Sequence, residues 1–194
     1  KAGGLLLGHT NMTELAYSGL GINPHYGTPD NPLYPGAVPG GSTSGGAVSV
    51  ALDLSDITIG TDTGGSTRIP AAFTGITGFK PTQDSISRDG VLSLSSSLDS
   101  VGLMAKNVEH CKLGYQAMTG NINTKQERLE NKKIKLIIPS NFGFENIDTE
   151  IRVAFDLAIK KISESGYEVI EMNIPILDLY KKVPIWQFAS VECA

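Results

Sequence analysis

Two serines lie in two glycine-rich segments of the chain, and together they could carry out covalent catalysis. Ser42 lies within residues 40–46 and Ser66 within residues 60–68, and a short apolar stretch separates the two segments. A glycine before a serine lets the backbone approach a substrate closely and turn its N–H groups inward, because no Cβ blocks the approach. The two glycines before Ser66 would place such donors beside its hydroxyl. A nucleophile next to donors that face a developing oxyanion is the minimum equipment for acyl transfer.

Other kinds of chemistry have less support in the sequence. No Gly-x-Ser-x-Gly segment occurs, so the sequence lacks the serine motif that a histidine base serves in a Ser-His-Asp triad. His9, His25 and His110 are each more often a loop or surface residue. The glycine-rich segments also lack the patterns that bind phosphate groups or dinucleotides. Cys111 and Cys193 do not have the spacing of a metal or redox site.

The residues around both serines resemble the signature of the amidase signature family. Residues 39–47 read Pro-Gly-Gly-Ser-Thr-Ser-Gly-Gly-Ala, and residues 60–71 read Gly-Thr-Asp-Thr-Gly-Gly-Ser-Thr-Arg-Ile-Pro-Ala. Ser42 and Ser66 are 24 positions apart, as the two catalytic serines of that family are. The resemblance is strong from about residue 5 to about residue 105 and is weaker after that. The flanking segments that extend it are residues 8–14, 75–82 and 97–102.

The resemblance implies a role for each residue around the two hydroxyls. Ser66 is the implied nucleophile, and Thr63, Gly64 and Gly65 form the implied oxyanion-hole segment that also binds the substrate. Ser42 is implied to follow a cis peptide bond and to relay a proton between the nucleophile and a lysine. An ordinary tight turn would need the same glycines, so the turn by itself does not distinguish a site from a loop.

Other positions near the serines receive structural roles or none. Asp62 and Arg68 lie on either side of the implied nucleophile, and we interpret them as a charge pair or backbone clamp that supports the loop. Thr43 and Ser44 occupy positions where many family members have serine and glycine. This loop is therefore a variant, and the relay role is not assigned to Ser44.

The third member of the implied Ser-Ser-Lys triad is a lysine upstream of the first serine loop. Counting back from Ser42 by the distance that the family uses passes the start of the chain at Lys1. We therefore interpret the chain as an internal fragment that lacks its catalytic lysine, and we expect this fragment to be inactive by itself. Lys80 is the nearest lysine downstream of Ser66, but the resemblance gives its segment a structural role.

The composition fits one soluble globular domain and excludes several kinds of partner. The chain has 194 residues, of which 40% are hydrophobic and 19% are charged. A net charge of −4 argues against nucleic acid or an anionic membrane as a direct partner, since both require a basic surface. The apolar runs are too short to span a bilayer, and no secretion signal is evident. With only two cysteines, a reduced, cytoplasmic setting is expected.

Hydrophobic patterns predict the elements that position the two loops. Residues 19–46 are dense in Gly, Pro, Asn and Ser, which indicates a long irregular loop. Thr10 or Asn11 is the expected N-cap of a helix or turn that runs to Tyr17. The other expected elements are buried strands at residues 5–7 and 57–59, a helix at 44–54, and a helix start and a short strand between residues 71 and 82.

A second segment follows a polar stretch at residues 120–133, which we interpret as a surface linker. It contains an expected strand at 134–138, a helix at 149–165 that ends at Gly166, and a strand at 167–172. Strand, helix and strand at this spacing predict a right-handed crossover unit. Such a unit indicates an α/β fold with a largely parallel sheet.

The resemblance implies the same class, a layered α/β/α fold with a mixed, largely parallel sheet that is truncated at both ends in this chain. We expect all 194 residues to be part of one domain. Residues 1–119 would form the core that carries both serine loops, and residues 120–194 would form a peripheral segment.

The function that the resemblance implies is hydrolysis of a linear carboxylic amide through a serine acyl-enzyme intermediate. No metal or organic cofactor is implied, and the expected partner is a small-molecule amide. Two alternatives stay open. The first is the A subunit of a glutamyl-tRNA(Gln) or aspartyl-tRNA(Asn) amidotransferase, where the triad releases ammonia from glutamine, although residues 16–27 resemble general amidases more. The second is a non-catalytic fragment or scaffold. The expected protein partner is a second copy of the chain, in a homodimer, or, under the first alternative, the other subunits of an amidotransferase.

Overall fold

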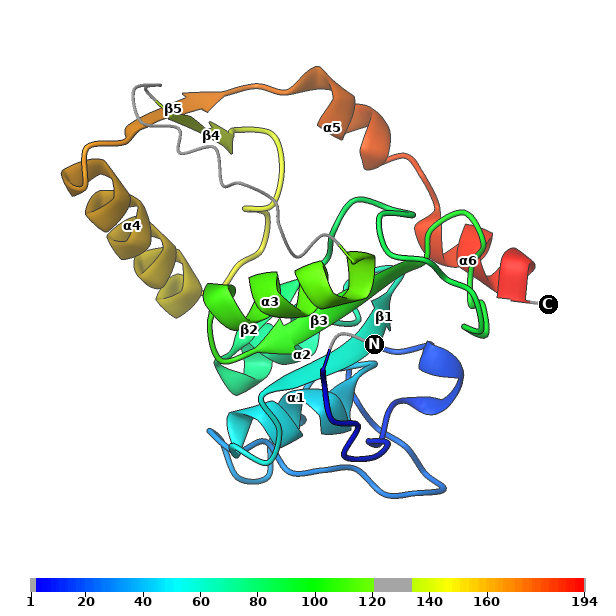
Figure 1. The fold of residues 1–194 in the computed structure, drawn as a ribbon. Helices are drawn as coiled ribbons and strands as arrows, with labels where there is room; N and C mark the ends of the chain where they lie inside the picture. Colours follow the sequence, from blue (N-terminus) through cyan, green and yellow to red (C-terminus); the bar gives the residue numbers. More distant parts are fainter. Residues whose placement is uncertain (1–2, 121–133, 194) are drawn as a thin grey trace. The chain divides into compact units, whose positions relative to one another are not determined.

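The computed structural model describes residues 3–120 and 134–193 of the chain (Figure 1). The chain divides into two compact units, of which the first comprises residues 1–124 and 185–194 and the second residues 125–184. The described residues 185–193 thus belong to the same unit as both serine loops.

A three-stranded sheet forms the centre of the first unit. Its strands, in spatial order, are β1 (Ile57–Asp62), β3 (Ser100–Ala105) and β2 (Thr77–Phe79). Every residue of β3 is buried, because this strand lies between two other strands and helices cover it. The pairing of β1 with β3 ends with Asp62 opposite Ser100, just where the second glycine-rich loop begins.

Helices cover both faces of this sheet, as expected for a layered fold. They are α1 (Ser44–Ala51), α2 (Arg68–Thr74) and α3 (Val108–Thr119). Successive residues of a strand point to opposite faces. Met104 of β3 packs with Ala47 of α1 and Ala71 of α2. Its neighbour Leu103 faces α3, where a Cβ at Gly114 would lie 3.2 Å from the Leu103 Cδ1.

The mixed α/β class is confirmed, but the first unit does not contain the expected parallel pairing. Both of its strand pairs, β1 with β3 and β2 with β3, are antiparallel. The reason is topological. β1 and β2 run in the same direction and are joined through α2, but β3 returns between them and separates them. The sequence pattern predicted β1 and a short strand near β2, but it predicted no strand at residues 100–105, where the central strand β3 lies.

Helix α1 lies close to β1, because a glycine on each side of the contact faces a threonine on the other side. A Cβ at Gly46 would lie 2.7 Å from the Thr58 Oγ1, and a Cβ at Gly60 would lie 2.5 Å from the Thr43 Oγ1. Real Cβ atoms do not approach other atoms so closely. The short distance between helix and strand therefore depends on the absence of side chains at both positions.

The N-terminal predictions are partly wrong. Residues 5–7 form no strand, and the side chains of Leu5, Leu6 and Leu7 are 83%, 82% and 67% exposed. A strand requires a partner for its backbone groups, and no described residue pairs with this segment. The expected helix or turn is a short 3₁₀ helix, η1 (Glu14–Ala16), whose N-cap is Thr13.

The predicted long loop is confirmed, since residues 19–43 contain no helix or strand. Polar side chains hold it in place. Asn23 Nδ2 donates to the Met12 carbonyl at 2.8 Å, and Asn31 Nδ2 donates to the carbonyls of Val38 and Phe73 at 3.1 and 3.0 Å. Buried amides of this kind replace the hydrogen bonds that regular structure would provide.

The second unit has the predicted strand, helix and strand. They are β4 (Lys135–Pro139), α4 (Thr149–Glu164) and β5 (Glu168–Met172), and β4 pairs with β5 in parallel. Gly166 follows the C-cap residue Ser165. Helix α5 (Pro175–Tyr180) completes the unit. The predicted linker at residues 120–133 lies almost entirely outside the described residues.

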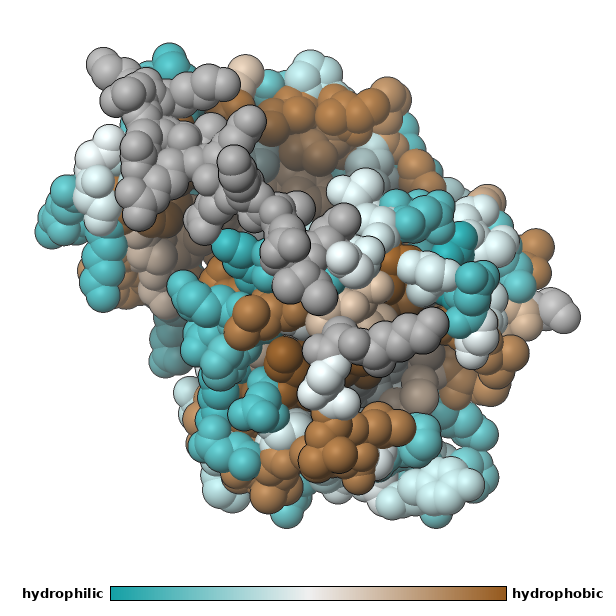
Figure 2. Space-filling view, viewed as in Figure 1, coloured by the Kyte–Doolittle hydropathy of each residue, from teal (hydrophilic) through white to brown (hydrophobic). Residues whose placement is uncertain are grey.

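Large apolar side chains lie at the surface of the molecule (Figure 2). In the second unit they include Ile151, Val153 and Leu157, which all lie on α4 and are more than half exposed. Between residues 3 and 120 and between 134 and 193, no helix is both long and apolar enough for a membrane span.

Candidate active site

A backbone hydrogen bond joins the two serine loops in the first unit. The Thr43 N–H donates to the Ser66 carbonyl at 3.2 Å, so the residue after the first serine binds the second serine directly. The Thr13 N–H donates to the Ser42 carbonyl at 2.9 Å and holds the first loop from the other side. Ser42 and Ser66 are both buried, with 0% and 9% of their surface exposed.

The peptide bond between Gly41 and Ser42 is cis, as the resemblance implied. The Ser42 Oγ is buried and has no hydrogen-bond partner among the described residues. The Ser44 Oγ shares this property. Most buried hydroxyls in proteins are hydrogen-bonded, so two such groups in one loop indicate a place where a further polar group is accommodated.

Ser66 lies at the turn between β1 and α2, and Gly65 makes this turn sterically possible. Gly65 has a φ of +136°, and a Cβ there would lie 2.7 Å from the Ile69 Cδ1. Its carbonyl accepts from the Ile69 N–H at 2.7 Å. No described residue accepts a hydrogen bond from the backbone N–H of Gly64, Gly65 or Ser66. These donors are therefore available to a ligand oxygen.

Asp62 and Arg68 form the predicted charge pair beside this turn. The Arg68 Nε and Nη2 donate to the two Asp62 carboxylate oxygens at 3.0 and 2.8 Å. The Thr67 N–H and hydroxyl also donate to the Asp62 Oδ2. Burial by itself would raise the pKa of Asp62, but the hydrogen bonds from Arg68 and Thr67 and the Arg68 charge outweigh it and hold the pKa below its ordinary value.

Thr63 is held by a buried carboxylate that sequence reasoning did not identify. The Thr63 hydroxyl donates to the Asp99 Oδ1 at 2.5 Å. The Asp99 Oδ2 accepts from the Ser93 hydroxyl and from the N–H groups of Leu94 and Ser95 at 2.8–3.0 Å. Asp99 lies within the segment 97–102 that carried part of the resemblance, but no sequence pattern showed that it would bind Thr63.

A second carboxylate, Glu192, holds the serine-rich loop that contains these donors. Glu192 lies on α6 (Ile185–Cys193) and accepts from the Ser95 hydroxyl. It also accepts from the Ser97 N–H at 3.1 Å and from the Ser97 hydroxyl at 2.6 Å. The hydrogen bonds from Ser95 and Ser97 lower the pKa of the Glu192 carboxyl.

Helix α6 also contributes an aromatic side chain to the second glycine loop. A Cβ at Gly64 would lie 2.9 Å from the Trp186 Cη2, so the indole lies against this glycine, which is otherwise exposed. The Tyr17 hydroxyl donates to the Trp186 carbonyl at 2.8 Å, and the two rings meet edge to face at 5.9 Å. The position of this tryptophan beside the loop could not be read from the sequence, because more than 100 residues separate the two.

Two further candidates, Lys80 and His25, have partners outside the two serine loops. Lys80 Nζ donates to the Pro81 carbonyl at 2.6 Å and contacts the Ser100 hydroxyl at 3.4 Å. His25 lies 3.3 Å from Glu14 at the surface. Within residues 3–120 and 134–193, no group of three or more His, Cys, Asp or Glu residues could hold a metal ion.

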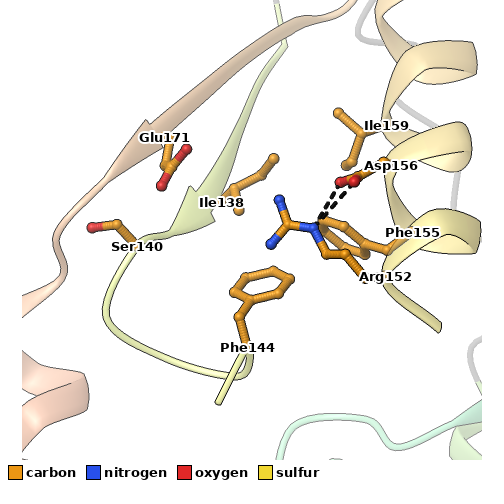
Figure 3. Close-up of a pocket in the computed structure, with 8 residues that line it drawn as sticks. All are labelled: Ile138, Ser140, Phe144, Arg152, Phe155, Asp156, Ile159 and Glu171. Atoms are coloured by element: carbon orange, nitrogen blue, oxygen red, sulfur yellow. Dashed lines mark hydrogen bonds and ion pairs between the residues drawn. The ribbon is translucent and has the colours of Figure 1, made fainter. Parts of the chain in front are cut away.

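A small cavity of about 130 Å³ lies in the second unit, between α4 and the β4–β5 pair (Figure 3). Arg152 extends over the Phe144 ring at 5.2 Å and pairs with Asp156 at 3.1 Å. None of the site residues that the sequence predicted lines this cavity. Its residues are Ile138, Ser140, Phe144, Arg152, Phe155, Asp156, Ile159 and Glu171.

Known proteins are similar to this chain over nearly its whole length. The family model described as Amidase matches residues 1–194. The A subunit of the glutamyl-tRNA(Gln) amidotransferase from Methanobrevibacter smithii is 36% identical over 190 residues, which are 91% of this chain and 41% of that protein. 2-Amino-5-chloromuconic acid deaminase of Comamonas testosteroni is 34% identical over 180 residues, which are 89% of this chain and 38% of that protein.

A solved structure is also similar to this chain in its fold. A crystal structure of an amidase matches with a TM-score of 0.89 and 33% sequence identity, and the match covers 98% of this chain and 43% of that one. The chain spans about two fifths of the length of the curated relatives that it matches.

Proposed function

Because this chain belongs to the amidase family, we propose that the protein is an amidase that hydrolyses a linear carboxylic amide through an acyl-enzyme intermediate on Ser66. The observation that carries the proposal is the turn at Ser66. There a buried serine follows two glycines, and the backbone N–H groups of Gly64, Gly65 and Ser66 have no acceptor among the described residues. This is the arrangement that acyl transfer requires.

In the proposed reaction, the Ser66 Oγ attacks the carbonyl carbon of the amide and forms a tetrahedral intermediate. The N–H groups of residues 63–66 stabilise the negative charge on its oxygen. When the intermediate collapses, the C–N bond breaks, the leaving amine takes up the proton that came from Ser66, and the acyl group stays on the serine. Water then attacks the ester by the reverse path and releases the acid.

Ser42 is proposed to relay the proton between Ser66 and a lysine. Its hydroxyl is buried and has no partner within the described part of the chain, so a further polar group can reach it there. The base would be the lysine that the resemblance places upstream of the first serine loop. A lysine accepts a proton near neutral pH only when its surroundings destabilise the charged form. Lys80 is unsuited to this role because Pro81 and Ser100 bind its ammonium group.

A second candidate function is favoured by the similarity to the A subunit of glutamyl-tRNA(Gln) amidotransferase. Under this alternative, the same serines release ammonia from glutamine for another subunit. The two candidates differ in a simple assay. An amidase hydrolyses simple amides alone, whereas the amidotransferase component is expected to release ammonia from glutamine only with its partner subunits present.

Labelling with a fluorophosphonate probe tests the nucleophile. In the full-length protein, the probe is expected to label Ser66, and Ser66→Ala is expected to abolish both labelling and amide hydrolysis. Ser87→Ala is the matched control, because Ser87 is an exposed serine of the same unit. Labelling that survives Ser66→Ala would overturn the assignment.

A further inference from the structure

The geometry points to Asp99 as a positioning residue that fixes the oxyanion-hole segment, with Glu192 as the outer anchor of the same network. This inference rests on the proposed function, since it concerns the loop that would hold the tetrahedral intermediate. Four residues form the chain of contacts: Thr63 binds Asp99, the Asp99 carboxylate accepts from the Ser95 backbone N–H, and the Ser95 hydroxyl binds Glu192.

The position of Thr63 explains why the loop needs this contact. The backbone pairing of β1 with β3 ends at Asp62 and Ser100, so Thr63 and Asp99 are the next residues along the two strands. Their side chains meet where the backbone ladder stops. The hydrogen bond between them therefore continues the attachment of β1 to β3 by one residue, up to the edge of the glycine turn.

The two residues after Thr63 cannot anchor themselves, because Gly64 and Gly65 have no side chains. Two side-chain attachments hold the start of the turn. Asp62 binds Thr67 and Arg68, which ties the start of the turn to the residues that follow it. Thr63 binds Asp99, which ties the start of the turn to the residue before β3. When the Thr63 contact is lost, the Asp62 contacts, α2 and the Thr43 N–H on the Ser66 carbonyl remain, but the first part of the turn loses its side-chain attachment beside β3. Displacement of such donors by about 1 Å is enough to cost much of their effect.

Asp99 is suited to this task because it is itself rigid. Only 2% of its surface is exposed, and its two oxygens accept four hydrogen bonds from Thr63, Ser93, Leu94 and Ser95. A buried carboxylate with this many donors is fully satisfied and has no alternative position. Oδ2 is held entirely by the loop at residues 93–95, and Oδ1 is left for Thr63.

Glu192 makes that loop rigid from outside. It lies 95 residues after Ser97 in the sequence and binds both the backbone and the side chain of that serine, in addition to Ser95. These contacts lie at Ser95, whose N–H binds Asp99, and two residues after it. Helix α6 thus reaches the turn through two side chains: Glu192, through Ser95 and Asp99, and Trp186, which lies against Gly64.

The test compares three variants of the full-length protein. Asp99→Asn keeps the size of the side chain but replaces an acceptor oxygen with a donor. Thr63→Val removes the hydroxyl, and Thr63→Ser retains it. Asp99→Asn and Thr63→Val are expected to lower kcat by a factor on the order of 10²–10³, the usual effect of losing one oxyanion donor, with KM changed by less than about threefold. Thr63→Ser is expected to keep near wild-type kcat.

The double variant and a matched control show whether the effect depends on the hydrogen bond between Asp99 and Thr63. Because Asp99 and Thr63 act through one hydrogen bond, the protein that combines Asp99→Asn with Thr63→Val is expected to be as active as the less active of the two single variants. Asp89→Asn, at an exposed aspartate of the same unit, is expected to change nothing. Additive losses in the double variant, or a Thr63→Ser protein as impaired as Thr63→Val, would overturn the inference.

Hydrogen–deuterium exchange of the peptide that covers residues 60–68 separates this inference from the proposed function. Exchange is expected to rise at least about tenfold in Asp99→Asn and Thr63→Val, and not in Asp89→Asn. If the wild-type protein hydrolyses no amide but exchange rises as expected, the proposed function fails and the positioning role stands. If the wild-type protein is active and neither exchange nor kcat responds, the positioning role is wrong.

Discussion

The carboxylate of Asp62 is completely buried next to the proposed nucleophile, and this is tolerable only because its partners are in place. Its side chain is 0% exposed, whereas that of Arg68 is 52% exposed. The guanidinium fork supplies two hydrogen bonds, and Thr67 supplies two more. A buried charge whose partner is removed is strongly destabilising, since the desolvation cost stays while the compensation is lost.

We therefore expect Arg68→Met to destabilise the fold in a pH-dependent way. The pKa of Asp62 is lowered in the folded state, so its ionised form stabilises the fold above about pH 4, and this contribution is lost as the pH falls through the folded-state pKa. At pH 7 the expected loss is about 1–3 kcal/mol, less than for a fully buried pair because half of Arg68 is exposed. In the variant, the unpaired and buried Asp62 takes up a proton more readily.

The free energy of unfolding in urea at pH 7 and at pH 4 checks this prediction. The difference between wild-type and variant proteins should be larger at pH 7 and should narrow at pH 4. Lys106→Met is the matched control, because Lys106 pairs with Asp53 at the surface, where ion pairs contribute little. A difference that stays constant with pH would mean that Arg68 stabilises the loop without acting through the charge of Asp62.

At the scale of single residues, the sequence identified what is local and missed what is distant. The two serines, the glycines and the Asp62 and Arg68 pair lie within short motifs, so their proximity could be predicted. Asp99 reaches Thr63 across 36 residues, and Glu192 reaches Ser95 across 97. No pattern in a single sequence specifies such contacts, because they depend on which strands and helices become neighbours.

At the scale of elements, the loop that joins β1 to α2 depends on a backbone conformation that other residues avoid. Gly65→Ala places a Cβ 2.7 Å from the Ile69 Cδ1 at a φ of +136°. We expect the donors of the turn to shift and kcat to fall by a factor on the order of 10²–10³. Amide hydrolysis by the full-length variant, together with its melting temperature, checks this expectation.

Gly90→Ala is the matched control for this change. Gly90 also has a positive φ, of +79°, but a Cβ there would meet no atom within 4 Å. That variant should lose only about 1–2 kcal/mol of stability and no activity. If the two alanine variants behave alike, the turn at Gly65 does not shape the site.

Several of the elements were predictable, whereas β3, α3, α5 and α6 were not predicted. Helices α1 and α4 and strands β1, β4 and β5 appear close to where the periodicity placed them. Residues 5–7 have an apolar pattern typical of a buried strand, yet they are exposed. Apolar periodicity indicates that a segment could be buried. Whether it becomes a strand depends on a partner strand, which the pattern does not reveal.

At the scale of the whole molecule, the unpaired Ser42 hydroxyl leads to a prediction about the 194-residue chain. No described residue within residues 3–120 and 134–193 hydrogen-bonds this hydroxyl. A serine without a base is a poor nucleophile, and losing one member of a triad costs most of the rate. The exposed apolar side chains at residues 5–7 and on α4 also favour aggregation. We expect the chain by itself to be inactive on simple amides and poorly soluble, and the full-length protein to be active.

An amide-hydrolysis assay of both proteins side by side checks this prediction. In the full-length protein, changing the lysine upstream of the first serine loop to alanine should abolish the activity. Turnover by the 194-residue chain that depends on Ser66 would contradict the prediction. Such a result would assign the role of the base to a lysine within the chain, and Lys80→Ala would then be the next variant to measure.

The close contact between α1 and β1 affects how a selection experiment on this protein must be interpreted. Any side chain at Gly60 would collide with Thr43, at a Cβ distance of 2.5 Å, and would separate the helix that follows Ser42 from the strand that leads to Ser66. In a library screened for growth on an amide, Gly60 would therefore tolerate substitution as poorly as Ser66 does. The cellular amount of each variant distinguishes the two. Substitutions at Gly60 would lower both abundance and growth, whereas Ser66→Ala would lower growth alone.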